Sequence, residues 1–231
     1  MTAQPGQPDA TAVIPLFPLG LVLVPGMVLP LHVFEPRYRT LVARLLERPH
    51  AERVFGVVAI REGHEVGADA VRALHHVGCT ARLVQASPSA DGTIDVMTMG
   101  TRRFALEAVH HDEPYATGTV TWLAEPDGDL GAEPVGPVLA AFEAYREALS
   151  AASGSTVSLG EPLPEDPAAL SYLLTSALVV DLAERQGLLE VPDTAGRLAA
   201  LRRVLRRETA LASALPSLPA GDLARTAVSL N

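Results

Sequence analysis

The chain has 231 residues, 48% of them apolar, and its 18 basic and 27 acidic side chains give a net charge of −9. This length allows one large or two small domains, and the apolar share is enough for a buried core. The negative charge argues against nucleic acid as the main partner, because a phosphate backbone calls for clustered positive charge.

The first apolar stretch, residues 13–33, contains no Asp, Glu or Arg and is long enough to cross a bilayer as a helix. Prolines exclude that helix, because each interior proline removes a hydrogen bond and clashes with the preceding turn; they are Pro15, Pro18, Pro25 and Pro30. The preceding residues carry no positive charge, which argues against a signal peptide. We therefore expect two buried strands, Val13–Leu19 and Val28–Phe34, joined through a turn at Pro25-Gly26, in a cytoplasmic protein.

A helix is predicted next, from Pro36 to about Arg48, because proline favours the first helical position and leucines recur at helical spacing. Short strands follow at close spacing, with a loop at 62–70 and a turn at Asp91-Gly92. Their expected ranges are 53–61, 80–86, 93–99, 102–108 and 116–123. This pattern favours a small closed or nearly closed barrel.

The second part of the sequence is predicted to be helical. An acidic stretch rich in Gly and Pro, residues 125–137, indicates a domain boundary. Helices are expected over 138–150, 167–185 and 194–212, with Gly187 as an interruption and Asp193 as an N-cap. The expected organisation is therefore α+β: a barrel with one helix over residues 12–125, a helical bundle over 134–213, and flexible tails at 1–11 and 216–231.

Candidate catalytic and metal-binding groups are few. His75, His76 and Cys79 are residue types that bind zinc, but a closed structural site needs four ligands, and neighbouring strand residues point to opposite faces. We expect Cys79 to be a buried packing residue instead. No lysine occurs, which excludes a Walker-type phosphate loop, a Ser-Lys dyad and a Schiff-base lysine. We predict no catalytic residue, no metal and no cofactor.

Arginines form two groups. Arg102 and Arg103 are adjacent, and a cluster on the last predicted helix comprises Arg202, Arg203, Arg206 and Arg207. A solvated helix face whose charges complement the helix dipole accounts for the cluster. The alternative is an anion or nucleic-acid patch made of Arg102, Arg103, Arg203 and Arg206.

The opening stretch, FPLGLVLVPGMVLPLHVFEPRYRTLV, resembles the start of the substrate-recognition (LON) domain of Lon proteases, most of all the stand-alone bacterial members. Further matches occur in the same order along the chain, to about Ala212. They are VGCTARL and DGT as a central hairpin, GTRRF as a G-x-x-R-F turn, and LAERQGLLE as part of a late helix pair. The resemblance implies a PUA-like β-barrel followed by a helical bundle, and a role in selecting protein substrates.

From this resemblance we expect a non-enzymatic protein- or peptide-binding module, an adaptor or quality-control factor whose partners are unfolded client proteins, since no ATPase or protease domain is recognisable. The alternatives are a small-ligand protein or enzyme using the cleft between barrel and bundle, and an RNA binder by PUA-like analogy. The candidate peptide-binding residues lie around the Pro25-Gly26 turn and the first helix: Pro25, Met27, Val28, Leu29, Phe34 and Tyr38. Whether Met27 is exposed or packed inside stays open.

Overall fold

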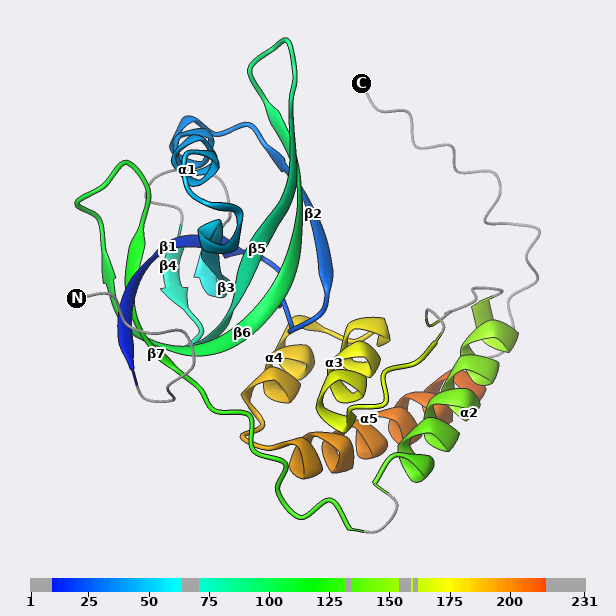
Figure 1. The fold of residues 1–231 in the computed structure, drawn as a ribbon. Coiled ribbons are helices and arrows are strands. Elements are labelled where there is room, and N and C mark those ends of the chain that lie inside the picture. The colour runs from blue at the N-terminus through cyan, green and yellow to red at the C-terminus, as the bar shows by residue number, and fades with distance from the viewer. Residues whose placement is uncertain (1–9, 64–70, 132–133, 154–158, 160–161, 215–231) are drawn as a thin grey trace. The chain divides into compact units, whose positions relative to one another are not determined.

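The structure, a computed structural model, describes residues 10–63, 71–131, 134–153, 159 and 162–214 (Figure 1). The expected mixture of sheet and helix is confirmed. The strands are β1 (Thr11–Leu19), β2 (Val28–Val33), β3 (Val54–Gly63), β4 (Val71–Leu74), β5 (Val77–Pro88), β6 (Ile94–His110) and β7 (Thr117–Trp122). The helices are α1 (Pro36–Leu46), a 3-10 turn η1 (His50–Glu52), α2 (Gly136–Ser153), α3 (Pro167–Ala177), α4 (Leu182–Glu190) and α5 (Thr194–Ala214).

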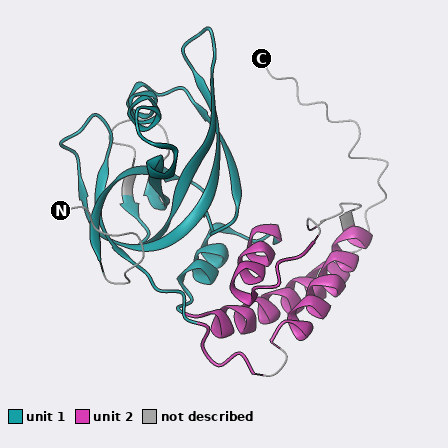
Figure 2. Cartoon of the chain, viewed as in Figure 1, with its two compact units in different colours: residues 1–126, 178–192 teal, residues 127–177, 193–231 magenta. Residues whose placement is uncertain are grey.

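The chain divides into two compact units (Figure 2). Unit 1 comprises residues 1–126 and 178–192, and unit 2 comprises residues 127–177 and 193–231. The break after residue 126 lies within the stretch 125–137, but α4 groups with the strands and not with the other late helices. The reason lies in its contacts: α4 packs against β5, and the Gln186 amide donates a hydrogen bond to the Val77 carbonyl over 2.9 Å.

Within unit 1, strand pairing forms a closed circuit. β1 pairs antiparallel with β7 and parallel with β3, and antiparallel pairs β7–β6, β6–β5 and β5–β3 complete the path. β4 adds to β3, and β2 adds to the first half of β6. The turn expected at Asp91-Gly92 joins β5 to β6, with Gly92 at a φ of +83° and the Asp91 carboxylate accepting from the Thr93 amide over 3.0 Å.

β6 is one strand of 17 residues, so the expected break at Gly100 is wrong. The two halves have different neighbours, because residues 94–99 pair with β2 while residues 104–110 pair with β7. Gly100 serves close packing instead of a turn. A Cβ built there would lie 2.1 Å from the Val24 carbonyl oxygen, so only glycine lets the two backbones approach.

Of the two strands expected to be buried, β1 is core in its second half, whereas β2 has alternate residues exposed. Ile14 and Leu16 pack in one buried cluster with β6 and β7, whereas Phe17 and Leu19 pack in another with α1 and β5. Successive strand residues point to opposite faces, so a strand buried on both faces needs apolar residues throughout.

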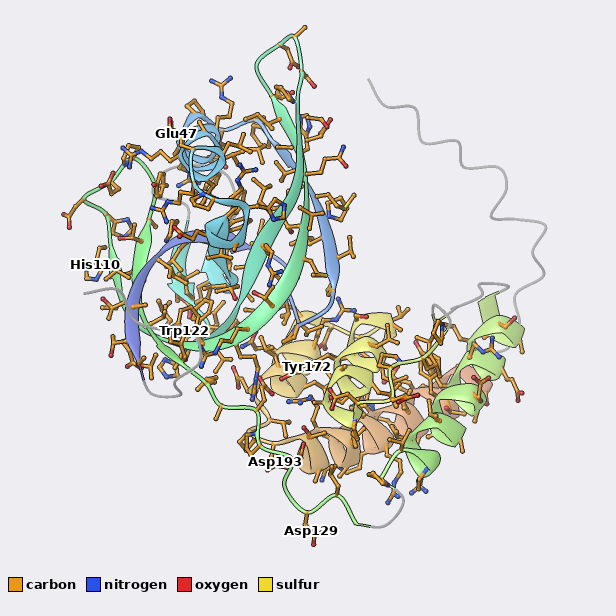
Figure 3. All side chains as sticks on the ribbon, in the orientation of Figure 1. Glu47, His110, Trp122, Asp129, Tyr172 and Asp193 are labelled. Atoms are coloured by element: carbon orange, nitrogen blue, oxygen red, sulfur yellow. The ribbon has the colours of Figure 1, made fainter. Side chains whose placement is uncertain are left out.

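In unit 2, α5 packs against α2 and α3. The predicted N-cap is confirmed: the Asp193 carboxylate accepts from the Gly196 amide over 2.7 Å (Asp193 is labelled in Figure 3). Arg197 is buried in this unit. Its guanidinium lies 3.8 Å from the centre of the Tyr172 ring, and its Nε donates to the Ser171 hydroxyl over 2.7 Å.

The helix expected over 167–185 is two helices, α3 and α4. Asp181 begins the second one, since its side chain accepts from the Glu184 amide over 2.8 Å. Gly187 lies inside α4 and does not interrupt it. Residues 64–70 and most of the expected tails lie outside the described residues, although Thr11 already belongs to β1. No helix in the described part of the chain is both long and apolar enough to span a bilayer.

Candidate functional site

The Pro25-Gly26 turn is fixed by hydrogen bonds at both ends. The Met27 amide donates to the Val24 carbonyl over 3.1 Å, and Gly26 has a φ of +78°, which is the conformation of a type II turn with proline first. The Gly26 amide donates to the Gly100 carbonyl over 2.9 Å, and the Gly100 amide donates to the Met27 carbonyl over 2.8 Å. The turn is therefore anchored to β6, and the start of β2 has a defined position.

Two of the six candidate residues at this turn and helix are well exposed: Val28 at 56% and Phe34 at 50%. Pro25 and Met27 are half-buried, and Met27 packs against the core cluster below it. The structure therefore answers the open question about Met27, which is a partly buried residue at the border of the surface.

The other two candidates are interior residues and cannot contact a partner. Leu29 points inward because it alternates with Val28 along β2. Tyr38 is 3% exposed, and its ring stacks on that of Phe17 with centroids 3.9 Å apart. Tyr38 was a candidate contact because its ring is amphipathic and lies near the turn, but α1 buries it against the core.

A shallow groove of about 420 Å³ lies on the outer face of β2, β5 and β6. Its lining residues are Pro30, Leu31, His32, Gln85, Ser87, Asp95, Val96 and Met97. Met97 is 39% exposed, and Val28 extends the apolar surface along β2. Sequence reasoning missed Met97, although its alternation with the buried Val96 and Thr98 is the signal of an outward-facing strand residue.

Charged and polar groups of the groove lie in one row across three strands. His32 on β2 and Ser87 on β5 are both opposite Asp95 on β6, and the His32 Nδ1 lies 2.7 Å from the Asp95 carboxylate. Asp95 is on the middle strand, so His32 and Ser87 lie on opposite sides of it. A Ser-His-Asp triad needs the histidine between the other two, so this row is unsuited to nucleophilic catalysis.

The arginine candidates are not equivalent. Arg103 is 1% exposed, so it cannot form part of an anion or nucleic-acid patch. Arg102 is half-buried, with its guanidinium 5.0 Å from the centre of the Trp122 ring (Trp122 is labelled in Figure 3), and burial lowers its pKa. Arg203 and Arg206 are exposed on α5 in unit 2.

Arg103 was a candidate only in the alternative anion or nucleic-acid patch, and the structure places its side chain inside unit 1. Its guanidinium donates to the Glu125 carboxylate, to the Ala124 carbonyl of the same segment, and to the Leu189 and Val191 carbonyls at the end of α4. The buried charge is thus compensated within this unit.

Cys79 is fully buried, as expected, and burial raises the pKa of its thiol to about 12. The His75 Nδ1 lies 4.0 Å from the Glu190 carboxylate, while His76 is exposed. Within the ranges that the structure describes, no three His, Cys, Asp or Glu side chains gather as metal ligands would.

A family model described as the ATP-dependent protease La (LON) substrate-binding domain matches residues 13–207. The chain belongs to this family. The resemblance of its opening motifs to the LON domain is therefore confirmed across almost all of its length.

Curated relatives of this LON domain are Lon proteases. The Lon protease of Cytophaga hutchinsonii is 24% identical over 217 residues, which cover 89% of this chain and 25% of that protein. Lon protease 2 of Herpetosiphon aurantiacus is 29% identical over 209 residues, which cover 86% of this chain and 24% of that protein. The LON domain thus spans about a quarter of the length of these relatives.

Solved structures agree on the fold. A Lon N-terminal domain protein from Xanthomonas campestris matches with a TM-score of 0.56 and 26% identity, over 89% of this chain and 99% of that one. The N-terminal domain of the Mycobacterium avium complex Lon protease matches with a TM-score of 0.51 and 20% identity, over 86% of this chain and 98% of that one. The second likeness concerns the fold alone.

Proposed function

We propose that this LON domain is a non-enzymatic module that binds exposed apolar segments of unfolded client proteins on the outer face of β2, β5 and β6. The observation that carries the proposal is the groove beside Met97, with the exposed Val28 two residues before the groove-lining Pro30 on β2. The family description, a substrate-binding domain of an ATP-dependent protease, supports a polypeptide as the ligand.

The chemistry of the groove suits segments of mixed sequence. Methionine is flexible and polarisable, so Met97 adapts to apolar side chains of different shape. Gln85 and Ser87 offer neutral donors and acceptors at the border, where His32 and Asp95 already form a pair. Because such contacts are individually weak, we expect micromolar affinity, about −8 kcal/mol.

The same proposal includes a role as an adaptor or quality-control factor in the cytoplasm. A single cysteine suits a reducing compartment, and the missing lysine argues against phosphate-loop and Ser-Lys chemistry. For the fold, the closed circuit of strand pairing in unit 1 supports a PUA-like β-barrel, and the packing of α5 with α2 and α3 supports a helical bundle.

The test replaces Met97 by Asp and measures capture of a permanently unfolded protein, reduced and carboxymethylated α-lactalbumin. We expect at least a tenfold loss of affinity, because the substitution places a charge where an apolar segment would be desolvated. Val109→Asp is the matched control, since Val109 lies on the same strand, is 37% exposed, and is outside the groove.

Two outcomes would count against the proposal. Equal capture by the Met97→Asp and wild-type proteins, with equal melting temperatures, removes the groove as the binding surface. Failure of the wild-type protein to retain any unfolded protein at micromolar concentration removes client binding itself.

A further inference from the structure

β2 is an edge strand. It pairs with β6 on one side, and no other strand in the described ranges pairs with it (Figure 1). Its exposed residues are Val28, Pro30 and His32, which alternate with less exposed ones. An open strand edge carries main-chain donors and acceptors that can accept another extended chain.

The register determines which groups of β2 face outward. In an antiparallel pair, alternate residues bond to the partner strand and the others face away from it. The Gly100 amide donates to the Met27 carbonyl, and β2 pairs with β6 from Val28 opposite Met99 onward. Odd-numbered residues of β2 therefore bond to β6, and Val28, Pro30 and His32 direct their main-chain groups to the open edge.

Pro30 gives independent support to this assignment. Proline has no amide hydrogen, so within a strand it is tolerated where that hydrogen is not needed for pairing. The open edge consequently offers two N–H donors, from Val28 and His32, and three carbonyl acceptors, from Val28, Pro30 and His32.

This arrangement disfavours pairing with a second copy of the same strand. A symmetric antiparallel pair centred on Pro30 would place two prolines opposite each other, and neither could donate. A chain of different sequence loses fewer main-chain hydrogen bonds, because its own amide can donate to the Pro30 carbonyl. The edge therefore suits a heterologous extended segment better than self-association.

We propose that the client segment binds as an added β-strand along the open edge of β2. This inference rests on the proposed function and specifies how the same surface holds its ligand. Main-chain bonds at Val28 and His32 are independent of the client's sequence, which suits a binder of varied clients. Side chains of the added strand on the face of Val28 and Pro30 would border the groove next to Met97.

The first experiment compares Val28→Pro with Val28→Thr. Both substitutions replace the valine side chain, but only proline removes the N–H that faces the open edge. The hydrogen bonds to β6 come from the odd-numbered residues, so both variants keep them. The probe is a fluorescein-labelled ten-residue peptide of alternating valine and serine, with binding followed by anisotropy. We expect Val28→Pro to bind about fivefold more weakly than Val28→Thr, the effect of one hydrogen bond. Pro30→Thr, which restores a donor, should bind more tightly.

The second experiment uses the wild-type protein, so it does not depend on how the variants fold. Amide hydrogen exchange should slow at Val28 and His32 when the peptide binds, whereas Leu29 and Leu31 should be protected already. Peptide binding without slower exchange at Val28 and His32 would overturn the added strand and leave groove binding intact. No binding of peptide or unfolded protein would remove the proposed function as well. Protection of both amides in the free protein, with dimers in sedimentation, would identify a second copy as the occupant and overturn the proposal.

Discussion

The Nε of Arg103 donates to the Glu125 carboxylate over 2.6 Å from a position inside unit 1 where the arginine is almost wholly buried. Its remaining nitrogens donate to main-chain carbonyls of Ala124, Leu189, Val191 and Pro192. One side chain therefore ties two chain segments to β6: the segment that leaves β7, and the end of α4.

Arg103→Met should lower the free energy of unfolding by about 3 kcal/mol, because it removes a buried charge pair and leaves carbonyl groups with fewer donors. Urea unfolding followed by circular dichroism measures the loss. Arg102→Met is the matched control on the neighbouring, half-buried position, and it should cost about 1 kcal/mol or less. Equal losses for the two variants would mean that the Arg103 contacts do not stabilise unit 1 as described.

Gly100→Ala should be more damaging than Gly26→Ala, although only Gly26 has a positive φ. A Cβ at Gly100 would lie 2.1 Å from the Val24 carbonyl oxygen, so backbone must move, at about 3 kcal/mol. A Cβ at Gly26 has no atom within 4 Å, and only the φ of +78° is unfavourable, at about 1 kcal/mol. Thermal melting of the two variants gives the comparison, and a reversed order would contradict it.

Met27→Asp should destabilise the protein by about 2 kcal/mol, because Met27 packs against the core cluster and the new charge would lose solvent there. Val28→Asp, one residue later and well exposed, should change stability by about 0.5 kcal/mol or less. Differential scanning calorimetry separates the two variants. If the Met27→Asp and wild-type proteins have the same melting temperature, then Met27 belongs to the exposed surface.

The Cys79 thiol should resist alkylation in the native state. Burial raises the pKa of this thiol to about 12, so the folded protein keeps a proton that the unfolded chain releases near pH 9. Unfolding therefore becomes more favourable as the pH rises from about 9 to 12, and the contribution of the neutral thiol is fully present below that range. Iodoacetamide at pH 8 should label the protein only after urea is added, and rapid labelling of native protein would contradict this assignment.

Local sequence patterns predicted most elements because each depends on neighbours in the chain. Prolines excluded a helix from the opening stretch, and Pro36 and Asp193 indicated where α1 and α5 begin. An error arose where one residue type suits two different structures, as glycine suits both a turn and a close contact between two backbones. Gly100 was interpreted as part of a turn from the resemblance of GTRRF to the family's G-x-x-R-F turn, whereas glycine is needed there because of the Val24 carbonyl, a contact that only the folded chain reveals.

The candidate surface depends on how strands pair with one another, and this pairing is not visible in the sequence of any one strand. Val28 and Phe34 were named as candidate contacts within a strand that was expected to be buried, and the structure leaves both of them exposed. The groove depends on the register that places His32 and Ser87 opposite Asp95, and nothing within a single strand specifies that register. Tyr38 was chosen for its amphipathic ring, and that property does not indicate which side of α1 meets the core.

The carbonyl groups that Arg103 binds also constrain the order in which the protein can fold. Unit 1 contains residues 178–192 as well as 1–126, and Arg103 and Val191 are 88 positions apart. During synthesis every strand of unit 1 is made well before α4. Until then the Arg103 guanidinium lacks the carbonyl acceptors at the end of α4. Contacts this distant in sequence slow folding. A fragment ending at residue 126 should consequently be a poor substitute for unit 1.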